Sequence, residues 1–300
     1  MSNMRGIRRC STLMITVLVA VGAVALPQGP SSATGVQAAA QVAVVNPTPA
    51  VIPAATWRAY RQAIIDSTVA TPEEVVTDLL VPTPADARTK WRTIEGEQYL
   101  LVGLLRREPF ANVKVGDRFS LSGDRWVSVP GQLDQACANY RCSAQSTSRL
   151  DQTLKQINGL PPDADYRYVV RFWIKATDLF RPCTDPRVSS ASCPEEVTSA
   201  SATAPVPTTL GTTNLASFLW QQTNYAWRMP DRFQPRTAVS CAKVWTTQNC
   251  YGFPWTRLGY TYDWSPKSKD DVGLTEFVAV SGATAYLEAV GSQREFFPRG

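Results

Sequence analysis

The sequence predicts an α+β fold: a main domain with a mainly antiparallel sheet, flanking helices and three local disulfides. Three observations lead to this prediction. Segments with helical and with strand periodicity do not alternate regularly, which disfavours repeated βαβ units. Hydrophobic residues make up 44% of the 300 residues, enough for a sizeable core. Six cysteines beyond the N-terminal region fall into three close pairs.

The N-terminal region carries the signals of export. Arg5, Arg8 and Arg9 precede 13 apolar residues, 13–25, that end in Ala23-Val24-Ala25. This pattern predicts a secretory signal peptide over residues 1–25, because a membrane-spanning helix needs about 20 apolar residues. Residues 26–55 contain no charge and are expected to form a flexible Ala/Pro-rich linker. We therefore expect a secreted, extracytoplasmic and monomeric protein without a permanent membrane anchor.

Residues 56–89 are expected to form a helical extension that packs on the main domain. Apolar residues at helical spacing predict a first helix over 57–68. Thr71 and Glu74 have the spacing of a capping box, with Pro72 between them suited to the first turn of a second helix over 72–80. Pro82 and Pro84 end that helix.

Residues 90–300 are expected to form the main domain, with a loop-rich segment at 182–213. Strands are predicted at 98–105, 166–174, 242–246 and 257–262, and helices at 132–138, 148–157 and 214–228. Two hairpins are predicted, at 118–129 around Ser122-Gly123-Asp124 and at 274–290 around Ser281-Gly282.

The cysteines predict disulfides and no metal site. Export places them in an oxidising compartment, and neither Cys-x-x-Cys knuckles nor histidines occur. Six cysteines allow 15 pairings, so the connectivity stays open, and the simplest choice joins near neighbours. Those pairs are Cys137–Cys142, Cys183–Cys193 and Cys241–Cys250.

Composition also excludes several functions. The chain has no histidine, which excludes Ser-His-Asp and Cys-His catalysis and any histidine general base. The formal charge is +5, but removal of residues 1–25 leaves 27 basic against 25 acidic residues. No basic run survives beyond Arg106-Arg107, so we expect no nucleic-acid partner.

The segment from Trp220 to Trp264 is unusually aromatic, with 11 aromatic residues in 45. One interpretation is an exposed platform that stacks on a sugar or another flat ligand. The other is a core and sheet built from large rings. The platform would bind a small-molecule, glycan or protein ligand outside the cytoplasm without a cofactor, and Trp255 is the ring expected to be most exposed. Its residues would be Trp255, Tyr260, Tyr262 and Trp264.

Glu276 is the candidate catalytic residue. A glutamate that opens a late strand, in Gly273-Leu-Thr-Glu-Phe-Val-Ala-Val-Ser-Gly282, resembles the catalytic strand of ADP-ribosyltransferases. The resemblance implies NAD as substrate, with Glu276 over the nicotinamide ribose, Ser128 on an earlier strand and Arg106 or Arg107 on the first. Leu274 departs from the arginine-modifying members, which carry a second acidic residue there. A solvated ion pair at Glu276 is the alternative, and acidic pairs such as Glu95 and Glu97 leave glycoside hydrolysis open.

Three longer stretches resemble a family of uncharacterised bacterial proteins. They are Asp178-Leu-Phe-Arg-Pro-Cys183, Pro254-Trp-Thr-Arg-Leu-Gly-Tyr-Thr-Tyr-Asp-Trp264 and Gly273-Leu-Thr-Glu-Phe-Val278. The resemblance extends from Trp91 to Val290 and implies that the stretches meet in space, but it implies no activity. Their charged residues would form either a polar ligand cluster on an aromatic floor or Arg–carboxylate bridges. Those residues are Arg181, Arg257, Asp178, Asp263 and Glu276.

Overall fold

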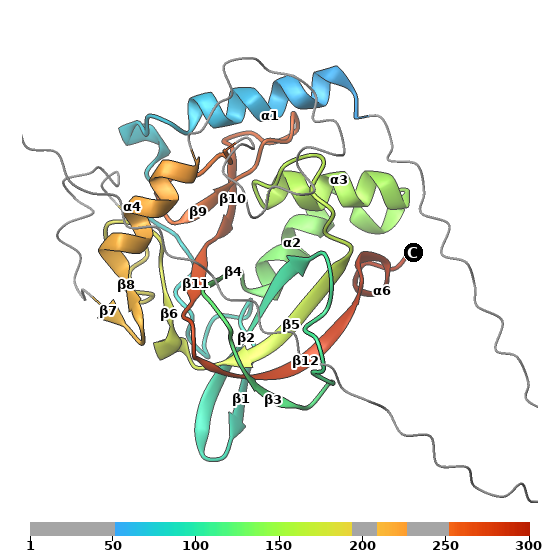
Figure 1. Ribbon diagram of the computed structural model, residues 1–300. Helices are drawn as coiled ribbons and strands as arrows, with labels where there is room; N and C mark the ends of the chain where they lie inside the picture. Colours follow the sequence, from blue (N-terminus) through green and yellow to red (C-terminus); the bar gives the residue numbers. More distant parts are fainter. Residues whose placement is uncertain (1–51, 194–208, 227–251) are drawn as a thin grey trace, which may run out of the picture. The chain divides into compact units, whose positions relative to one another are not determined.

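The computed structural model describes residues 52–193, 209–226 and 252–300 (Figure 1). Its helices are α1 (Ala54–Asp66), α2 (Pro130–Asn139), α3 (Thr147–Ile157), α4 (Leu215–Ala226) and α6 (Gln293–Phe296), with 3-10 turns η1 (Pro72–Glu74), η2 (Cys142–Ala144) and η3 (Ala176–Asp178). Its strands are β1 (Trp91–Ile94), β2 (Glu97–Arg106), β3 (Arg118–Ser120), β4 (Arg125–Val127), β5 (Tyr168–Ile174), β6 (Leu179–Phe180), β7 (Thr209–Leu210), β8 (Thr213–Asn214), β9 (Tyr260–Tyr262), β10 (Val272–Thr275), β11 (Phe277–Ala279) and β12 (Thr284–Ser292).

Two antiparallel sheets build the domain. The larger has the order β1-β2-β5-β12-β3, and the smaller has the order β4-β11-β6. The main hydrophobic core takes side chains from both sheets and from α4, including Val102, Phe172, Phe277, Leu287 and Phe218. Strands β9 and β10 form a separate antiparallel pair. The predicted α+β class with mainly antiparallel pairing is confirmed.

Strand alternation explains why the larger sheet is covered on both faces. On β5, Phe172 and its alternate neighbours enter the main core, whereas Val169 packs in a second core with Leu133, Leu150 and Leu154 of α2 and α3. Figure 1 shows α2, α3 and α6 gathered on one side of the long strands. The helices predicted at 132–138, 148–157 and 214–228 correspond to α2, α3 and α4.

Both predicted hairpins are wrong, because each turn carries the chain from one sheet to the other. β3 pairs with β12, while β4 pairs with β11. The second turn separates β11 in the smaller sheet from β12 in the larger one. The Asp124 side chain joins the two turns, since its Oδ1 accepts hydrogen bonds from the Thr213 hydroxyl at 2.6 Å and from the Ser281 backbone N–H at 2.8 Å.

The predicted second helix at 72–80 is also wrong. The Thr71–Glu74 capping box is present, but it starts only the 3-10 turn η1. The chain is then extended, because backbone groups beyond the turn find partners in distant segments. Leu79 N–H donates to Ala191 O at 2.9 Å, and Leu80 N–H donates to Thr275 Oγ1 at 2.9 Å. These tertiary bonds replace the bonds that a helix would have formed.

Two of the three predicted disulfides are confirmed, Cys137–Cys142 and Cys183–Cys193. Cys241 and Cys250 lie outside the described residues, as do the predicted strand at 242–246 and the signal peptide, so these stay predictions. No helix in the described part of the chain is long and apolar enough to cross a membrane.

We predict that replacing both Cys183 and Cys193 by serine lowers the free energy of unfolding by about 2–3 kcal/mol, because the crosslink restricts the unfolded chain. Urea denaturation of the oxidised protein measures this change. The Cys137–Cys142 disulfide closes a shorter loop, so its double serine variant should lose somewhat less of the free energy of unfolding. An unchanged urea midpoint in the Cys183/Cys193 variant would contradict the prediction.

Candidate functional site

Five of the seven residues that the sequence predicted as ligand-binding contact another part of the same chain. We call residues 52–80 the N-terminal segment. We call the side chains that receive it the binding face, namely Arg181, Arg257, Tyr260, Tyr262, Trp264 and Thr275. Helix α1 begins the contact: Trp57, Tyr60, Ala63 and Ile64 pack against Tyr262 and Trp264 in one buried cluster. The rings of Tyr60 and Trp264 meet edge to face with centroids 5.4 Å apart.

Side-chain donors of the binding face then follow the segment past the end of α1. Arg257 Nη2 donates to Ser67 O at 2.7 Å, and Tyr260 Oη donates to Glu74 O at 2.9 Å. These carbonyls belong to a helix end and a 3-10 turn, where the backbone leaves acceptors unfilled. The binding face therefore recognises the segment's backbone as well as its side chains.

The segment ends at Leu80, which is bound through both of its backbone polar groups. Its N–H donates to Thr275 Oγ1, and its carbonyl accepts from Arg181 Nη2 at 3.2 Å. Leu79 is buried with Leu258, Tyr260 and the Cys183–Cys193 disulfide. This end of the segment resembles a bound extended peptide, with paired backbone groups and an anchoring leucine.

Arg181 joins the segment to the disulfide loop. It is fully buried, and its Nη2 also donates to Val188 O at 3.4 Å and Ser190 O at 2.9 Å. Its guanidinium carbon lies 5.1 Å from the centre of the Phe277 ring. Burial lowers the pKa of Arg181 to about 10, although the charges of Asp185 and Glu276 oppose this shift. The side chain therefore stays charged at neutral pH.

A sharp turn at residues 257–259 brings the binding face close to the segment. Arg257 and Gly259 both adopt positive φ, at 63° and 83°. A Cβ on Gly259 would lie 2.7 Å from Arg181 Cδ and 2.9 Å from Leu79 Cδ1. Glycine at this position therefore permits both the turn and the close packing.

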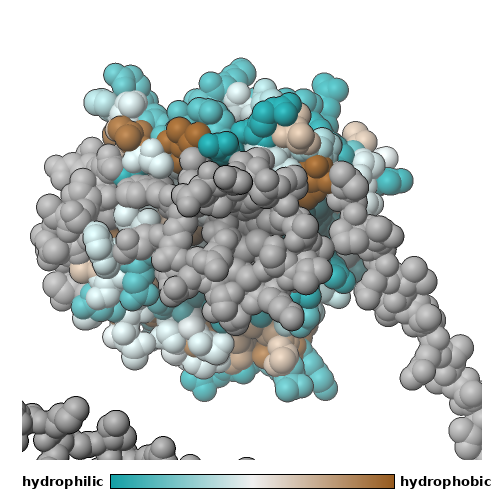
Figure 2. All heavy atoms as spheres, turned by 45° about the horizontal axis from the view of Figure 1, so that its top comes forward, coloured by the Kyte–Doolittle hydropathy of each residue, from teal (hydrophilic) through white to brown (hydrophobic). Residues whose placement is uncertain are grey.

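The predicted open aromatic platform is wrong. Trp255, expected to be the most exposed ring, is 1% exposed, and Tyr260, Tyr262 and Trp264 are also buried. Trp255 packs edge to face on Trp126, while the other three rings contact the N-terminal segment or the backbone beneath it. In Figure 2 teal and white predominate among the coloured residues, and the brown, hydrophobic residues lie in separate small patches. The rings are covered because the segment supplies their apolar partners.

The predicted polar cluster is only partly assembled. Arg181 and Glu276 are buried close enough to influence each other's pKa. Asp263 belongs to another contact, in which it accepts from Tyr140 Oη at 2.6 Å and from Ser265 N at 3.0 Å. Within the described residues Arg181 forms no carboxylate bridge, since its hydrogen bonds go to backbone carbonyls.

The three predicted catalytic residues do not share one pocket. Pairing of β4 with β11 places Ser128 across from Glu276, just beyond the paired residues. Ser128 lines a small hollow, with an internal volume of about 10 Å³, that neither Glu276 nor Arg106 lines. The Arg106 guanidinium instead lies 4.1 Å from the centre of the Phe110 ring, and its Nε donates to Glu108 O.

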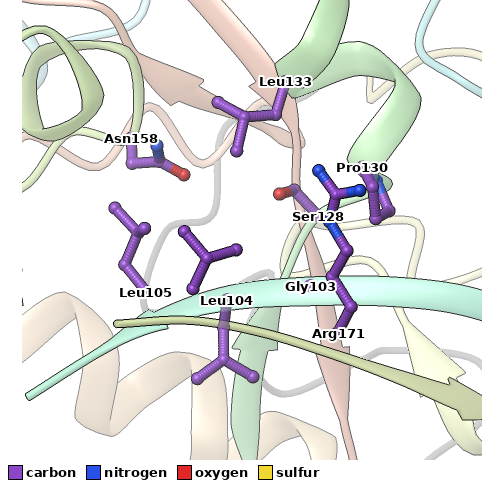
Figure 3. A pocket seen from close by; sticks show the side chains of 9 residues that line it. Gly103, Leu104, Leu105, Ser128, Pro130, Leu133, Asn158 and Arg171 are labelled. Atoms are coloured by element: carbon purple, nitrogen blue, oxygen red, sulfur yellow. The ribbon is translucent and has the colours of Figure 1, made fainter. Parts of the chain in front are cut away.

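The hollow beside Ser128 is small and mostly apolar. Figure 3 shows Ser128 and Asn158 pointing into it beneath Leu133. Its lining consists of Gly103, Leu104, Leu105, Ser128, Pro130, Leu133, Asn158, Val169 and Arg171. A volume of about 10 Å³ holds about one water molecule, so this hollow is far too small for an ordinary ligand. No group of three or more acidic or cysteine side chains in the described ranges could hold a metal ion.

Glu276 is the most perturbed acidic group of this region. Burial raises its pKa to about 8, against the opposing influences of the Trp255 side chain and the Arg181 charge. The side chain therefore keeps its proton at neutral pH. Its backbone N–H donates to Gly259 O at 2.9 Å, which fixes it beside the turn of the binding face.

Little in the sequence indicates that residues 66–80 are the occupant of the binding face. The helical spacing of residues 57–65 predicted packing on the main domain, but the hydrogen bonds to Ser67, Glu74 and Leu80 go to backbone atoms. Every residue type carries a backbone carbonyl, so the sequence does not show which of these acceptors will be bound. Comparison with known proteins adds nothing here: no family model, no curated protein and no solved structure matches the chain.

We predict that Gly259→Ala destabilises the protein more than Gly282→Ala does. Both glycines have φ of 83°, so both variants lose the conformational freedom that favours glycine. Only at Gly259 does the new Cβ meet neighbours, which adds about 1–3 kcal/mol of overpacking. Urea denaturation of the two variants checks this difference, and equal losses would contradict it.

We predict that Glu276→Gln removes part of the pH dependence of stability. The pKa of Glu276 is about 8 in the folded protein and about 4.5 in the unfolded chain, so between these pH values the folded protein binds more protons than the unfolded chain. The free energy of unfolding should therefore fall by a few kcal/mol as pH rises from about 4.5 to about 8. Denaturation at several pH values should show a flatter profile for Glu276→Gln and an unchanged one for the exposed control Glu97→Gln.

Proposed function

We propose that this chain is an exported binding domain whose ligand is a polypeptide segment received by the binding face. One observation carries the proposal: buried Arg181, Arg257, Tyr260 and Thr275 bind the backbone of residues 67–80. The N-terminal segment occupies this face as a ligand in cis. A segment from another chain would need the same acceptors at the same spacing.

The contacts define the ligand's chemistry. Two guanidinium groups and a tyrosine hydroxyl donate hydrogen bonds to backbone carbonyls, which every polypeptide has. Selectivity then comes from two apolar anchors of the segment. One is the aromatic face of α1, which packs against Tyr262 and Trp264, and the other is Leu79, which lies beside the Cys183–Cys193 disulfide. Main-chain hydrogen bonds with side-chain pockets are the usual division of roles in peptide recognition.

Export is part of the proposal. The two disulfides are typical of proteins from oxidising compartments. The basic residues and apolar stretch of residues 1–25 have the pattern of a signal peptide. A ligand outside the cytoplasm, in the medium or at the cell envelope, is consistent with both features.

An ADP-ribosyltransferase-like activity on NAD is the weaker candidate. Its supporting observation is that Glu276 is a strongly perturbed carboxyl group, since burial raises its pKa to about 8, and perturbed groups are enriched at functional sites. Against it, Arg106 lies over Phe110, and Ser128 faces a hollow too small for a dinucleotide. Peptide binding accounts for more of the buried polar contacts.

Cutting the chain between the segment and the main domain tests the proposal. Residues 83–85 are exposed, so a protease site can be introduced there in the full chain. After cleavage we expect the segment to stay bound and to exchange with a fluorescent peptide of residues 52–81, followed by anisotropy. A segment that never exchanges with excess peptide while the protein stays folded would show that it is a fixed part of the fold.

Arg257→Met provides the matched variant. Loss of a charge-assisted hydrogen bond to the buried Ser67 carbonyl costs about 1.5–3 kcal/mol. Peptide affinity should therefore fall roughly tenfold to a hundredfold. Arg92→Met is the control, because Arg92 on β1 is exposed and its ion pair among the described residues is with Glu288 at 3.8 Å, so the affinity of this variant should match that of the parent protein. Equal affinities for all three proteins would contradict the assigned role of Arg257.

A further inference from the structure

Where α1 ends, two carboxylates share one phenol. Tyr262 Oη lies 2.7 Å from Oδ2 of Asp66, the last residue of α1, and 3.1 Å from Oδ2 of Asp271, which precedes β10. A phenol carries one hydrogen, so it can donate to only one of the two carboxylates. The second contact becomes a hydrogen bond only if that carboxyl group brings its own proton.

The surroundings decide which carboxylate holds this proton. Asp66 is exposed, whereas Asp271 is half-buried. Burial raises the pKa of Asp271; the Tyr262 hydrogen bond opposes this, and the charges of Asp66, Asp270 and Glu74 raise it further. When Asp271 carries the proton, it donates to Tyr262 Oη and Tyr262 donates to Asp66, which completes a chain of two hydrogen bonds.

Acidic groups dominate the neighbourhood of this contact. Asp66 comes from α1, Glu74 from η1, Asp270 from the loop before β10 and Asp263 from the end of β9, where its backbone N–H donates to Asp271 O at 2.8 Å. Arg257, a cation of the binding face, interacts with Glu74 and is bonded to Ser67 O. Removal of the proton therefore leaves several carboxylates facing one another.

We propose that Asp66, Tyr262 and Asp271 form a proton-dependent clasp that holds the N-terminal segment on the binding face more tightly in acid than at neutral pH. This inference rests on the proposed function, because it assigns a control to the same face. When the segment leaves, Asp66 leaves with it, Asp271 meets water, and the shared proton is lost. Proton release on dissociation means that a rise in pH favours dissociation.

The cleaved full chain tests the clasp through release of the fluorescent peptide of residues 52–81 between pH 4.5 and 7.5. We expect the dissociation constant of the parent protein to rise several-fold over this range. In Asp271→Asn the amide donates to Tyr262 at every pH, so affinity should stay at its acid value. Asp117→Asn is the control: Asp117 is exposed and accepts from Lys114 N–H at 2.8 Å in the turn before β3, away from the binding face, so this variant should keep the full pH dependence.

Hydrogen–deuterium exchange of the intact chain gives a second measurement that needs no peptide exchange. After correction for intrinsic rates, the α1 amides should open several-fold more often at pH 7.5 than at pH 5 in the parent protein, and equally often in Asp271→Asn. Equal opening of the parent protein at both pH values would overturn the clasp. Saturable peptide binding without pH dependence would overturn the clasp alone, whereas absence of peptide exchange at every pH would overturn the proposed function.

Discussion

Buried backbone carbonyls need hydrogen-bond donors, and this requirement organises the region around the N-terminal segment. Beyond α1, residues 67–80 contain only the short turn η1 while they lie against the main domain, so the carbonyls of buried residues such as Ser67 and Leu80 need donors from elsewhere. Arg181 and Arg257 fill this need from the other side of the contact. Burial of two guanidinium groups is costly, and the charge-assisted bonds to carbonyls offset that cost.

The rest of the fold places these donors. The two sheets share one core, and the turns that connect them bring β11 beside β4 and β6. Phe277 of β11 supports the Arg181 guanidinium, and Glu276 just before it binds the turn at Gly259 through its backbone. The disulfide loop then closes over Leu79. The first residues of β11 therefore pack in the core and also position the side chains that contact the N-terminal segment.

The backbone contacts of the N-terminal segment lie next to a group of titratable side chains. The binding face offers cations and hydroxyl groups to carbonyls, whereas the end of α1 collects carboxylates around Tyr262. The first set holds the segment at any pH at which arginine is charged. The second set forms the proposed clasp, which would make binding of the segment depend on pH.

Local signals in the sequence determined the α+β class, the positions of α2, α3 and α4, the capping box at Thr71 and two near-neighbour disulfides. Each depends on residues a few positions apart, so residue type alone specifies it. The tertiary structure decided which sheet each hairpin strand joins, why residues 75–80 are extended and which rings are covered. These depend on hydrogen bonds and packing between positions up to about 200 residues apart, such as Leu80 with Thr275, and a backbone acceptor has no residue type by which a sequence could reveal it.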